Sequence, residues 1–151
     1  MTKTFNSQAY ARAKTAGYRS GLEDKVADQL NQTGLTYAYE SKESKIPYNV
    51  PTSDHTYNPD FTFNTSIIVE TKGIFALADR KKHLLIKAQH PDKEVRFVFS
   101  NSKAKIAKGS KTSYAHWCDK YGFIYADKLI PDEWLEEIRE LQLLNIQKAK
   151  H

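Results

Sequence analysis

Three residues near the middle of the chain have the types and the spacing for metal-assisted chemistry. Asp60 follows Pro59, and Glu70 and Lys72 come a short distance further along. A divalent ion such as Mg²⁺ prefers carboxylate oxygens and removes the repulsion between two acids held close together. With such an ion, and with a lysine that orients water or stabilises developing negative charge, this group has the parts that phosphodiester hydrolysis requires.

The sequence around these residues predicts a β-hairpin. Two runs rich in aromatic and β-branched residues flank a turn at 64–66, so that Asp60 opens one strand and Glu70 closes the next. Because side chains alternate along a strand, Glu70 and Lys72 share one face and the apolar residues take the other. The alternative is an amphipathic hairpin whose charged face only meets solvent, and this short pattern alone does not separate the two.

Length and composition indicate one globular domain. The 151 residues are 40% hydrophobic and 27% charged, and the net charge of +5 favours a polyanionic partner. The single cysteine, Cys118, excludes an intrachain disulfide and is expected in the core of a cytoplasmic protein with no zinc site. The sequence has neither a basic start followed by an apolar run nor a long apolar segment. We therefore expect a protein that is neither secreted nor membrane-spanning.

Residues 20–32 predict an amphipathic helix, because apolar residues recur at four-residue spacing and a glycine follows. Ser20 and Glu23 match a capping box, in which Glu23 only holds the helix start. The functional interpretation places Glu23 against Asp60 and Glu70 as a third carboxylate. The residues alone favour the capping role.

The remaining elements follow from periodicity and from the positions of glycine and proline. In chain order they are a strand at 35–42, an extended connector at 44–58, a helix at 79–89, a strand at 95–99, a short helix at 114–121, an edge strand at 123–125 and a helix at 131–148. The order helix, strand, strand, strand, helix, strand predicts an α/β fold. The last helix is acidic, so we expect it to pack on the core or on another subunit and not on DNA.

Three basic clusters are candidates for contacts with a nucleic-acid backbone. The first 18 residues form a basic arm, with a loosely ordered terminus as the alternative. Cations in the first turns of the 79–89 helix oppose the helix dipole, which favours a facing phosphate over a solvated basic face. An acid-free loop is the third cluster. The candidate residues are Arg12, Lys14 and Arg19 at the arm, Arg80, Lys81 and Lys82 on the helix, and Lys103, Lys105, Lys108 and Lys111 in the loop.

Taken together, these motifs resemble a known nuclease family. The pattern from Pro59-Asp60 to Glu70-Thr71-Lys72 and the element order are similar to the PD-(D/E)xK, restriction-endonuclease-like core. Longer runs between residues 18 and 134 resemble the phage endonuclease I family of Holliday-junction-resolving enzymes. The matching runs are 19–26, 55–61, 69–73, 79–86, 108–110, 112–114 and 126–131.

The resemblance implies a single nuclease domain, 1–151, with a mixed sheet flanked by helices. It also implies a metal-dependent endonuclease that cleaves four-way junctions and other branched DNA. Glu23, Asp60, Glu70 and Lys72 would be the catalytic residues, which reverses the preference for Glu23 as a cap. Asp60, Glu70 and the Thr71 carbonyl would bind one Mg²⁺ or Mn²⁺, and Glu23 would help to hold a second ion.

The resemblance further implies a symmetric, domain-swapped homodimer in the host-cell cytoplasm. Residues 44–58 would cross between subunits, so that each site takes Glu23 from one chain and the other catalytic residues from its partner. Two features depart from the family: the arm matches only loosely, and an acidic helix stands where the family has a basic tail. The alternatives are a general duplex or single-strand nuclease of the same fold and a non-catalytic junction-binding protein.

Overall fold

The structure is a computed structural model that describes residues 21–50 and 53–149. Its helices and strands are α2 (Gly21–Thr33), β1 (Ala38–Tyr39), a short 3₁₀ turn (Lys42–Ser44), β2 (Ile46–Val50), β3 (Ser53–Tyr57), β4 (Phe61–Thr62), β5 (Ile67–Lys72), α3 (Leu77–Gln89), β6 (Glu94–Phe99), α4 (Tyr114–Tyr121), β7 (Ile124–Asp127) and α5 (Asp132–Ala149). The predicted basic arm lies outside the described residues.

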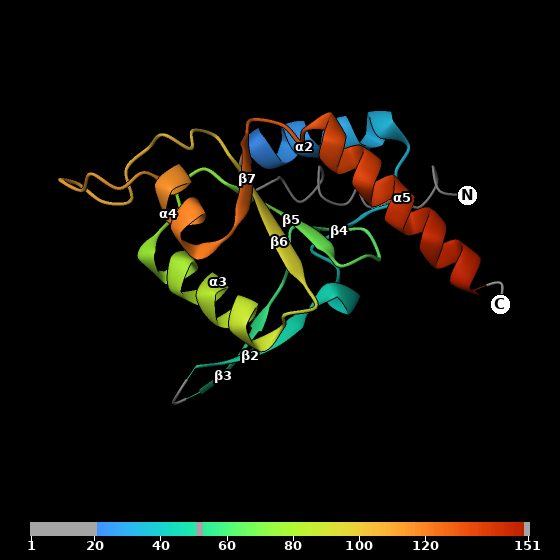
Figure 1. Ribbon diagram of the computed structural model, residues 1–151, viewed down its shortest axis with the longest axis horizontal. Coiled ribbons are helices and arrows are strands. Elements are labelled where there is room, and N and C mark those ends of the chain that lie inside the picture. The colour runs from blue at the N-terminus through green and yellow to red at the C-terminus, as the bar shows by residue number, and fades with distance from the viewer. Residues whose placement is uncertain (1–20, 51–52, 150–151) are drawn as a thin grey trace.

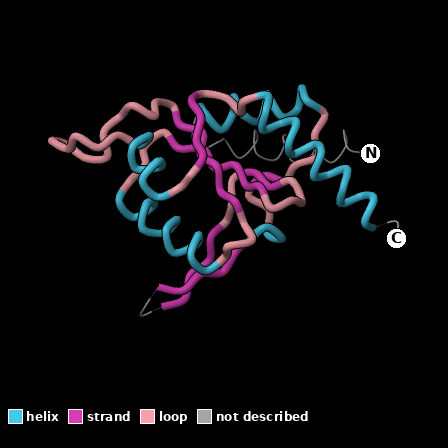
Figure 2. Tube along the Cα trace, in the orientation of Figure 1, coloured by secondary structure: helices cyan, strands magenta, loops and turns pink. Residues whose placement is uncertain are grey.

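A five-stranded mixed sheet in the order β1-β4-β5-β6-β7 forms the centre of the molecule. β1, β4 and β5 pair antiparallel, whereas β5, β6 and β7 run parallel. α2 and α5 cover one face, and α3 and α4 cover the other (Figures 1 and 2). The predicted α/β fold with a mixed, helix-flanked sheet is confirmed, with β2 and β3 as an additional two-stranded sheet.

β5 is the central strand and is buried along almost its whole length. Ile67 and Val69 join the core under α2 and α5, while Ile68 joins the aromatic core under α3 and α4. The predicted alternation of side chains is therefore confirmed. The alternative of a charged face open to solvent is wrong, because a second layer of structure covers the face that carries Glu70, leaving it 3% exposed.

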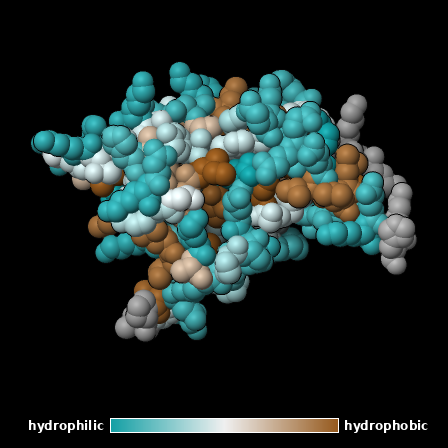
Figure 3. Space-filling model, viewed as in Figure 1, coloured by the Kyte–Doolittle hydropathy of each residue, from teal (hydrophilic) through white to brown (hydrophobic). Residues whose placement is uncertain are grey.

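α2 is joined to the segment between β7 and α5 by a reciprocal pair of hydrogen bonds. Gln29 donates from Nε2 to the Ile130 carbonyl at 2.7 Å and accepts from the Ile130 N–H at 2.9 Å. Along α5, the apolar spacing in the sequence predicts an inward stripe through Trp134, Ile138 and Leu144, and Trp134 and Ile138 are buried. Leu144 is 50% exposed, because the last turns of α5 extend past the core (Figures 1 and 3).

The opposite layer is an aromatic cluster centred on Phe75. Its ring contacts those of Phe97 and Trp117 at centroid distances of 4.9 Å. Cys118 is fully buried in this cluster, as predicted, and burial raises the pKa of its thiol to about 12. Gly122 ends α4 in a left-handed conformation, with φ of 76°, which confirms the predicted glycine stop.

α3 differs from its prediction at the start and in its buried face. The helix begins at Leu77 and not at Asp79, which lies in the first turn. The side chains packed inward are Arg80, His83 and Ile86. The sequence predicts that Ala88 faces inward, but Ala88 is exposed. It lies on a different side of the helix from Arg80, His83 and Ile86, which face the sheet.

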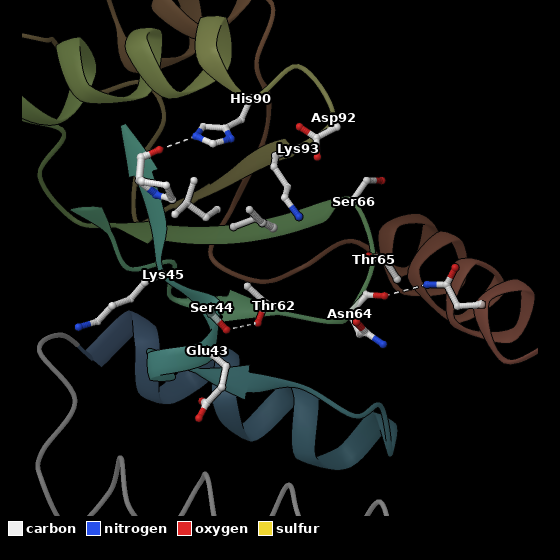
Figure 4. A pocket seen from close by; sticks show the side chains of 14 residues that line it. Glu43, Ser44, Lys45, Thr62, Asn64, Thr65, Ser66, His90, Asp92 and Lys93 are labelled. Atoms are coloured by element: carbon white, nitrogen blue, oxygen red, sulfur yellow. Dashed lines mark hydrogen bonds between the residues drawn. The ribbon is translucent and has the colours of Figure 1, made fainter. Parts of the chain in front are cut away.

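The segment expected as an extended connector is extended, but it folds back as a hairpin within the chain. β2 and β3 pair from Ile46 with Tyr57 to Val50 with Ser53. Pro47 fits because a two-stranded sheet has only edge strands. The start of the hairpin is tied to the end of α3, where His90 Nε2 contacts the Pro47 carbonyl oxygen (Figure 4).

The strand predicted at 35–42 is reduced to Ala38–Tyr39, because its partner β4 offers only two residues for pairing. Leu35 and Tyr37 are nevertheless buried in the core. Within the described parts of the chain, none of the helices combines the length and the apolarity that crossing a membrane demands.

Candidate active site

Three acids lie side by side near the ends of three neighbouring strands of the sheet. The pairing of β1 with β4 and of β4 with β5 places Glu40, Asp60 and Glu70 at the next position beyond the paired residues. The Glu40 N–H donates to the Asp60 carbonyl at 3.1 Å, and the Asp60 N–H donates to Glu70 Oε1 at 3.0 Å. The predicted meeting of Asp60 and Glu70 across the hairpin is confirmed.

A fourth acid reaches this site from α2. Glu23 is 5% exposed, and the Tyr39 hydroxyl donates to its Oε2 at 2.6 Å. Glu23, Glu40 and Asp60 each offer a carboxylate oxygen within 4.8 Å of the others. Glu23 therefore lies at the acidic cluster of its own chain, whereas the resemblance implies that it joins the cluster of the partner chain. Its predicted capping partner, Ser20, lies outside the described residues.

Glu40 holds a backbone conformation that is rare for a residue with a side chain. Its φ of 44° lies in the left-handed region. A non-glycine residue in that region costs on the order of 1 kcal/mol or more and persists only where its surroundings enforce it. The bond from its N–H to Asp60 is one such constraint. Backbone strain at a carboxylate of the cluster is typical of functional sites.

Glu70 is fully buried and is held from two sides. The Tyr57 hydroxyl donates to Glu70 Oε1 at 2.6 Å, beside the bond from Asp60. On the other side, Lys72 Nζ lies 3.6 Å from Glu70 Oε2. Burial raises the pKa of Glu70, and the nearby Lys72 ammonium and the Tyr57 hydroxyl oppose that rise.

Lys72 lies between carboxylates of the sheet and of α3. Its Nζ is 3.6 Å from Asp79 Oδ1 as well as 3.6 Å from Glu70. Asp79 also lies 3.8 Å from Lys82 Nζ. This chain of charges fixes the Lys72 ammonium beside the acids while leaving the Lys72 side chain 15% exposed.

The four carboxylates make the site strongly anionic. Burial raises the pKa of Asp60 well above its ordinary value, and the charges of Glu70 and Glu23 raise it further. The Thr71 N–H and hydroxyl each donate to Asp60 Oδ2 at 2.9 Å, which lowers that pKa in part. Thr71 thus orients Asp60, and the role implied for its carbonyl as a metal ligand stays a prediction.

The donors fit a hard divalent cation. Carboxylate oxygens are the ligands that Mg²⁺ and Mn²⁺ favour, and besides burial the neighbouring carboxylates raise the pKa of Asp60, an effect that a bound cation would oppose. The acids line a hollow of about 460 Å³. Its lining consists of Glu23, Glu40, Thr56, Tyr57, Asn58, Asp60, Glu70, Thr71, Lys72, Gly73, Asp79 and Lys82.

The predicted basic contacts have mixed outcomes. Lys82 lines the hollow and Lys81 is exposed. Arg80 is only 6% exposed because it packs on the inner face of α3. The expectation that Arg80 is available to a nucleic-acid backbone is therefore wrong. The loop lysines are all exposed at Lys103, Lys105, Lys108 and Lys111. Arg12, Lys14 and Arg19 lie outside the described residues.

The sequence analysis missed four residues of the site. Glu40, Tyr39 and Tyr57 approach the acids through strand pairing, which a single sequence does not show. Asp79 was interpreted only as a helix cap, although it pairs with Lys72. A usable signal was the run Tyr39-Glu40 at the end of a predicted strand, because the neighbouring hairpin also ends in acids.

Glu40→Gln should weaken divalent-ion binding about 10- to 100-fold, because it removes one of the clustered carboxylate charges while preserving the size of the side chain. Isothermal titration with Mn²⁺ measures the affinity. The matched control is Glu43→Gln, an exposed acid three residues along. Wild-type affinity in Glu40→Gln would remove Glu40 from the set of ion ligands.

Asp60→Asn should stabilise the protein in chelator at neutral pH by about 1–3 kcal/mol. The folded pKa of Asp60 is raised, so the wild type loses stability as pH rises from about 4 through that pKa. The asparagine variant lacks this loss. Urea unfolding across pH measures the difference, with exposed Asp92→Asn as the control. Added Mn²⁺ should stabilise only the wild type, and a variant less stable than wild type in chelator at neutral pH would contradict the argument.

Comparison with known proteins agrees with the geometry of the site. Residues 3–151 match the sequence family described as Phage endonuclease I. The chain is 54% identical over 124 residues to Endonuclease I of Escherichia phage T7, covering 82% of each protein. It is 52% identical over 131 residues to Endodeoxyribonuclease 1 of Enterobacteria phage T3, covering 85% of each. This chain belongs to the phage endonuclease I family.

Proposed function

We propose that this protein is a divalent-metal-dependent endodeoxyribonuclease that resolves four-way (Holliday) junctions and cleaves other branched DNA by phosphodiester hydrolysis. The observation that carries the proposal is the buried group of Glu23, Asp60 and Glu70 beside Lys72 at an open hollow. Membership of the phage endonuclease I family supports it. A protein that only bound DNA would gain nothing from carboxylates turned toward phosphates.

Asp60 and Glu70, with Glu23 and Glu40 beside them, would hold Mg²⁺ or Mn²⁺, and the Thr71 carbonyl is a further candidate ligand. When bound, two such ions polarise the phosphoryl oxygen, generate the nucleophile from water and stabilise the leaving oxygen. The chain itself orients the acids. Tyr39 and Tyr57 each hold one carboxylate by a hydrogen bond, while Thr71 holds Asp60 by two.

Lys72 has the place of a residue that positions water or stabilises charge. Glu70 and Asp79 flank its ammonium on two sides, each at 3.6 Å, and hold it beside the acids. A held ammonium donates hydrogen bonds to an attacking water or to a non-bridging phosphate oxygen as negative charge develops. Lys72 thus contributes to the reaction directly, whereas Asp79 fixes its position.

The DNA would lie across the basic surfaces that border the acids. Lys82 lines the hollow itself, and Lys81 is exposed on the same helix. The exposed loop lysines from Lys103 to Lys111 are further candidates for contacts with the backbone. Contacts of this kind bind the backbone and not the bases, so selection of a branch point would rest on DNA shape.

We further propose that the active protein is a domain-swapped homodimer. The last described pair of the hairpin is Val50 with Ser53, at the point where β2 leads into β3. If the chain continues straight there, β2 and β3 form one long strand, and the same pairs form between two chains. Glu23 and Glu40 precede this point, whereas Asp60, Glu70 and Lys72 follow it. Each site would then combine residues of both subunits, and two sites at a fixed separation would make paired cuts.

An end-labelled four-way junction should be cut near its branch point in Mg²⁺, while a linear duplex of matched sequence is left largely intact. Chelator should abolish cutting. Glu70→Ala should reduce cleavage by at least about a thousandfold but keep junction binding, because it removes a metal ligand and leaves every basic side chain in place.

The outcomes of this assay separate the alternatives. Equal cutting of junction and duplex would indicate a general nuclease of the same fold. Binding without cutting in Mg²⁺ and in Mn²⁺ would favour a non-catalytic junction-binding protein. Retained cleavage in Glu70→Ala would remove Glu70 from the mechanism.

Mixing a Glu23→Ala chain with a Lys72→Ala chain should restore cleavage if the subunits are swapped. One site of each heterodimer then carries both substitutions, and the other carries neither. Random pairing leaves roughly one site in four intact, so nicking should recover to about that fraction of wild-type activity. Co-refolded mixtures are assayed on the four-way junction beside each variant alone.

A mixture that stays inactive would show that each chain builds its own site, as the hairpin seen within the chain permits. The control is a refolded mixture of wild type with Lys72→Ala, which must retain activity for the comparison to hold. Junction cleavage by the wild type would still support the nuclease itself, so the two proposals are tested separately.

A further inference from the structure

A second hollow lies between α2 and the segment that joins β7 to α5. Its volume is about 790 Å³. Leu22 and Leu129 contribute apolar surface, and Lys25 and Lys128 stand on α2 and on the β7–α5 segment respectively. The remaining lining residues are Gly21, Asp28, Gln29, Gln32 and Ser100.

This hollow lies next to the acidic one. On α2, Leu22 lines one hollow and the next residue, Glu23, lines the other. At the sheet, the Ser100 N–H donates to the Lys72 carbonyl at 3.2 Å, which joins the two linings again. Because β5, β6 and β7 run parallel, Lys72, Ser100 and Lys128 all lie at the carboxyl ends of their strands.

The two walls are held at a fixed separation. The reciprocal amide bonds between Gln29 and Ile130 join α2 directly to the β7–α5 segment. Lys128 adopts a left-handed conformation, with φ of 73°, which is unfavourable for lysine. It is kept there by a bond from its N–H to the Phe99 carbonyl at 2.7 Å and by one from the Leu129 N–H to Asp127 at 2.8 Å. The groove is thus built in advance of any ligand.

Each wall of the groove carries one lysine, Lys25 on α2 and Lys128 on the β7–α5 segment. Within the described part of the chain, neither Lys25 nor Lys128 forms an ion pair. The carboxylate of Asp127, next to Lys128, accepts hydrogen bonds from the Ser102 N–H at 2.6 Å and from the Ser102 hydroxyl at 2.7 Å. Asp28 is the one acid in the lining, and it is exposed.

We propose that this groove binds the sugar–phosphate backbone of the cut strand directly beside the scissile phosphate, with Lys25 and Lys128 contacting phosphates from opposite walls. The inference rests on the proposed nuclease function. Apolar side chains between two cations suit a deoxyribose flanked by phosphates, and the position of this hollow next to the acidic one, at the carboxyl ends of the parallel strands, would let one strand reach both. The strand would be fixed on one side of the reacting phosphorus, which aligns it for attack.

The test replaces phosphates of the cut strand one at a time with neutral methylphosphonates, within a few nucleotides of the cut. Junction affinity is measured in chelator for the wild type, Lys25→Ala and Lys128→Ala. Each alanine variant should bind about two- to tenfold more weakly, with the slope of log affinity against log salt smaller by about one. Each should also lose its sensitivity to replacement at one phosphate, a different one for each lysine.

Two controls separate a contact from a change in folding or in overall charge. Lys128→Arg keeps the charge and should keep wild-type sensitivity. Lys93→Ala removes an exposed lysine from the loop before β6, at the opposite end of the parallel strands. It should either leave junction affinity unchanged or lower it by the same factor for every junction, whichever phosphate is replaced.

The inference is overturned if the wild type binds and cuts the junction while both alanine variants keep its affinity and its sensitivity at every phosphate. It is also overturned if the lost sensitivity lies far from the cut. A wild type that neither binds nor cuts junctions would instead contradict the proposed function, and with it this inference.

Discussion

The mutual repulsion of four clustered carboxylates, three of them buried, is the constraint on which the rest of this structure depends. Glu23, Glu40, Asp60 and Glu70 would separate in water, and the fold holds them together through strand pairing and hydrogen bonds from tyrosine and threonine side chains. The cost appears as the raised pKa of Asp60 and as the unusual backbone of Glu40. Hydrophobic side chains in these positions would give a more stable protein, so such a cost is retained only where function requires the charges.

The site stands where the two layers of the fold meet, and neither layer could form it alone. α2 contributes Glu23 from the layer that contains α5, while α3 contributes Asp79 to hold Lys72 from the aromatic layer. β5 connects the two, since Thr71 bonds to Asp60 while Glu70 bonds to Tyr57. Preorganisation of this kind needs rigid elements under each functional group, and here the closely packed aromatic rings around Phe75 provide them on one side.

Local patterns in the sequence were sufficient for the hairpin, for the meeting of Asp60 and Glu70, and for most helices, because strand alternation, turn residues and caps act over a few positions. Pairings between distant segments could not be derived in this way. Glu40 was missed because β1 is two residues long and is defined only by its pairing with β4. The β2–β3 hairpin was missed because Pro47 and Pro51 indicate an extended chain but not whether that chain pairs with itself. Proline is compatible with an edge strand, and both strands of a hairpin are edge strands. Buried Arg80 was misjudged because charge alone does not report which face of α3 meets the sheet.

The two tryptophans divide between the layers. Trp134 packs with α2 and the sheet, whereas Trp117 lies in the aromatic cluster with Phe75 and Phe123. Arg96 lies over the Trp134 ring, while the Trp117 ring contacts the rings of Phe75, Tyr121 and Phe123, so the two indoles have different electrostatic surroundings. Their fluorescence therefore gives separate optical signals for the two halves of the core, and a difference in their order of exposure on unfolding would show which half loosens first.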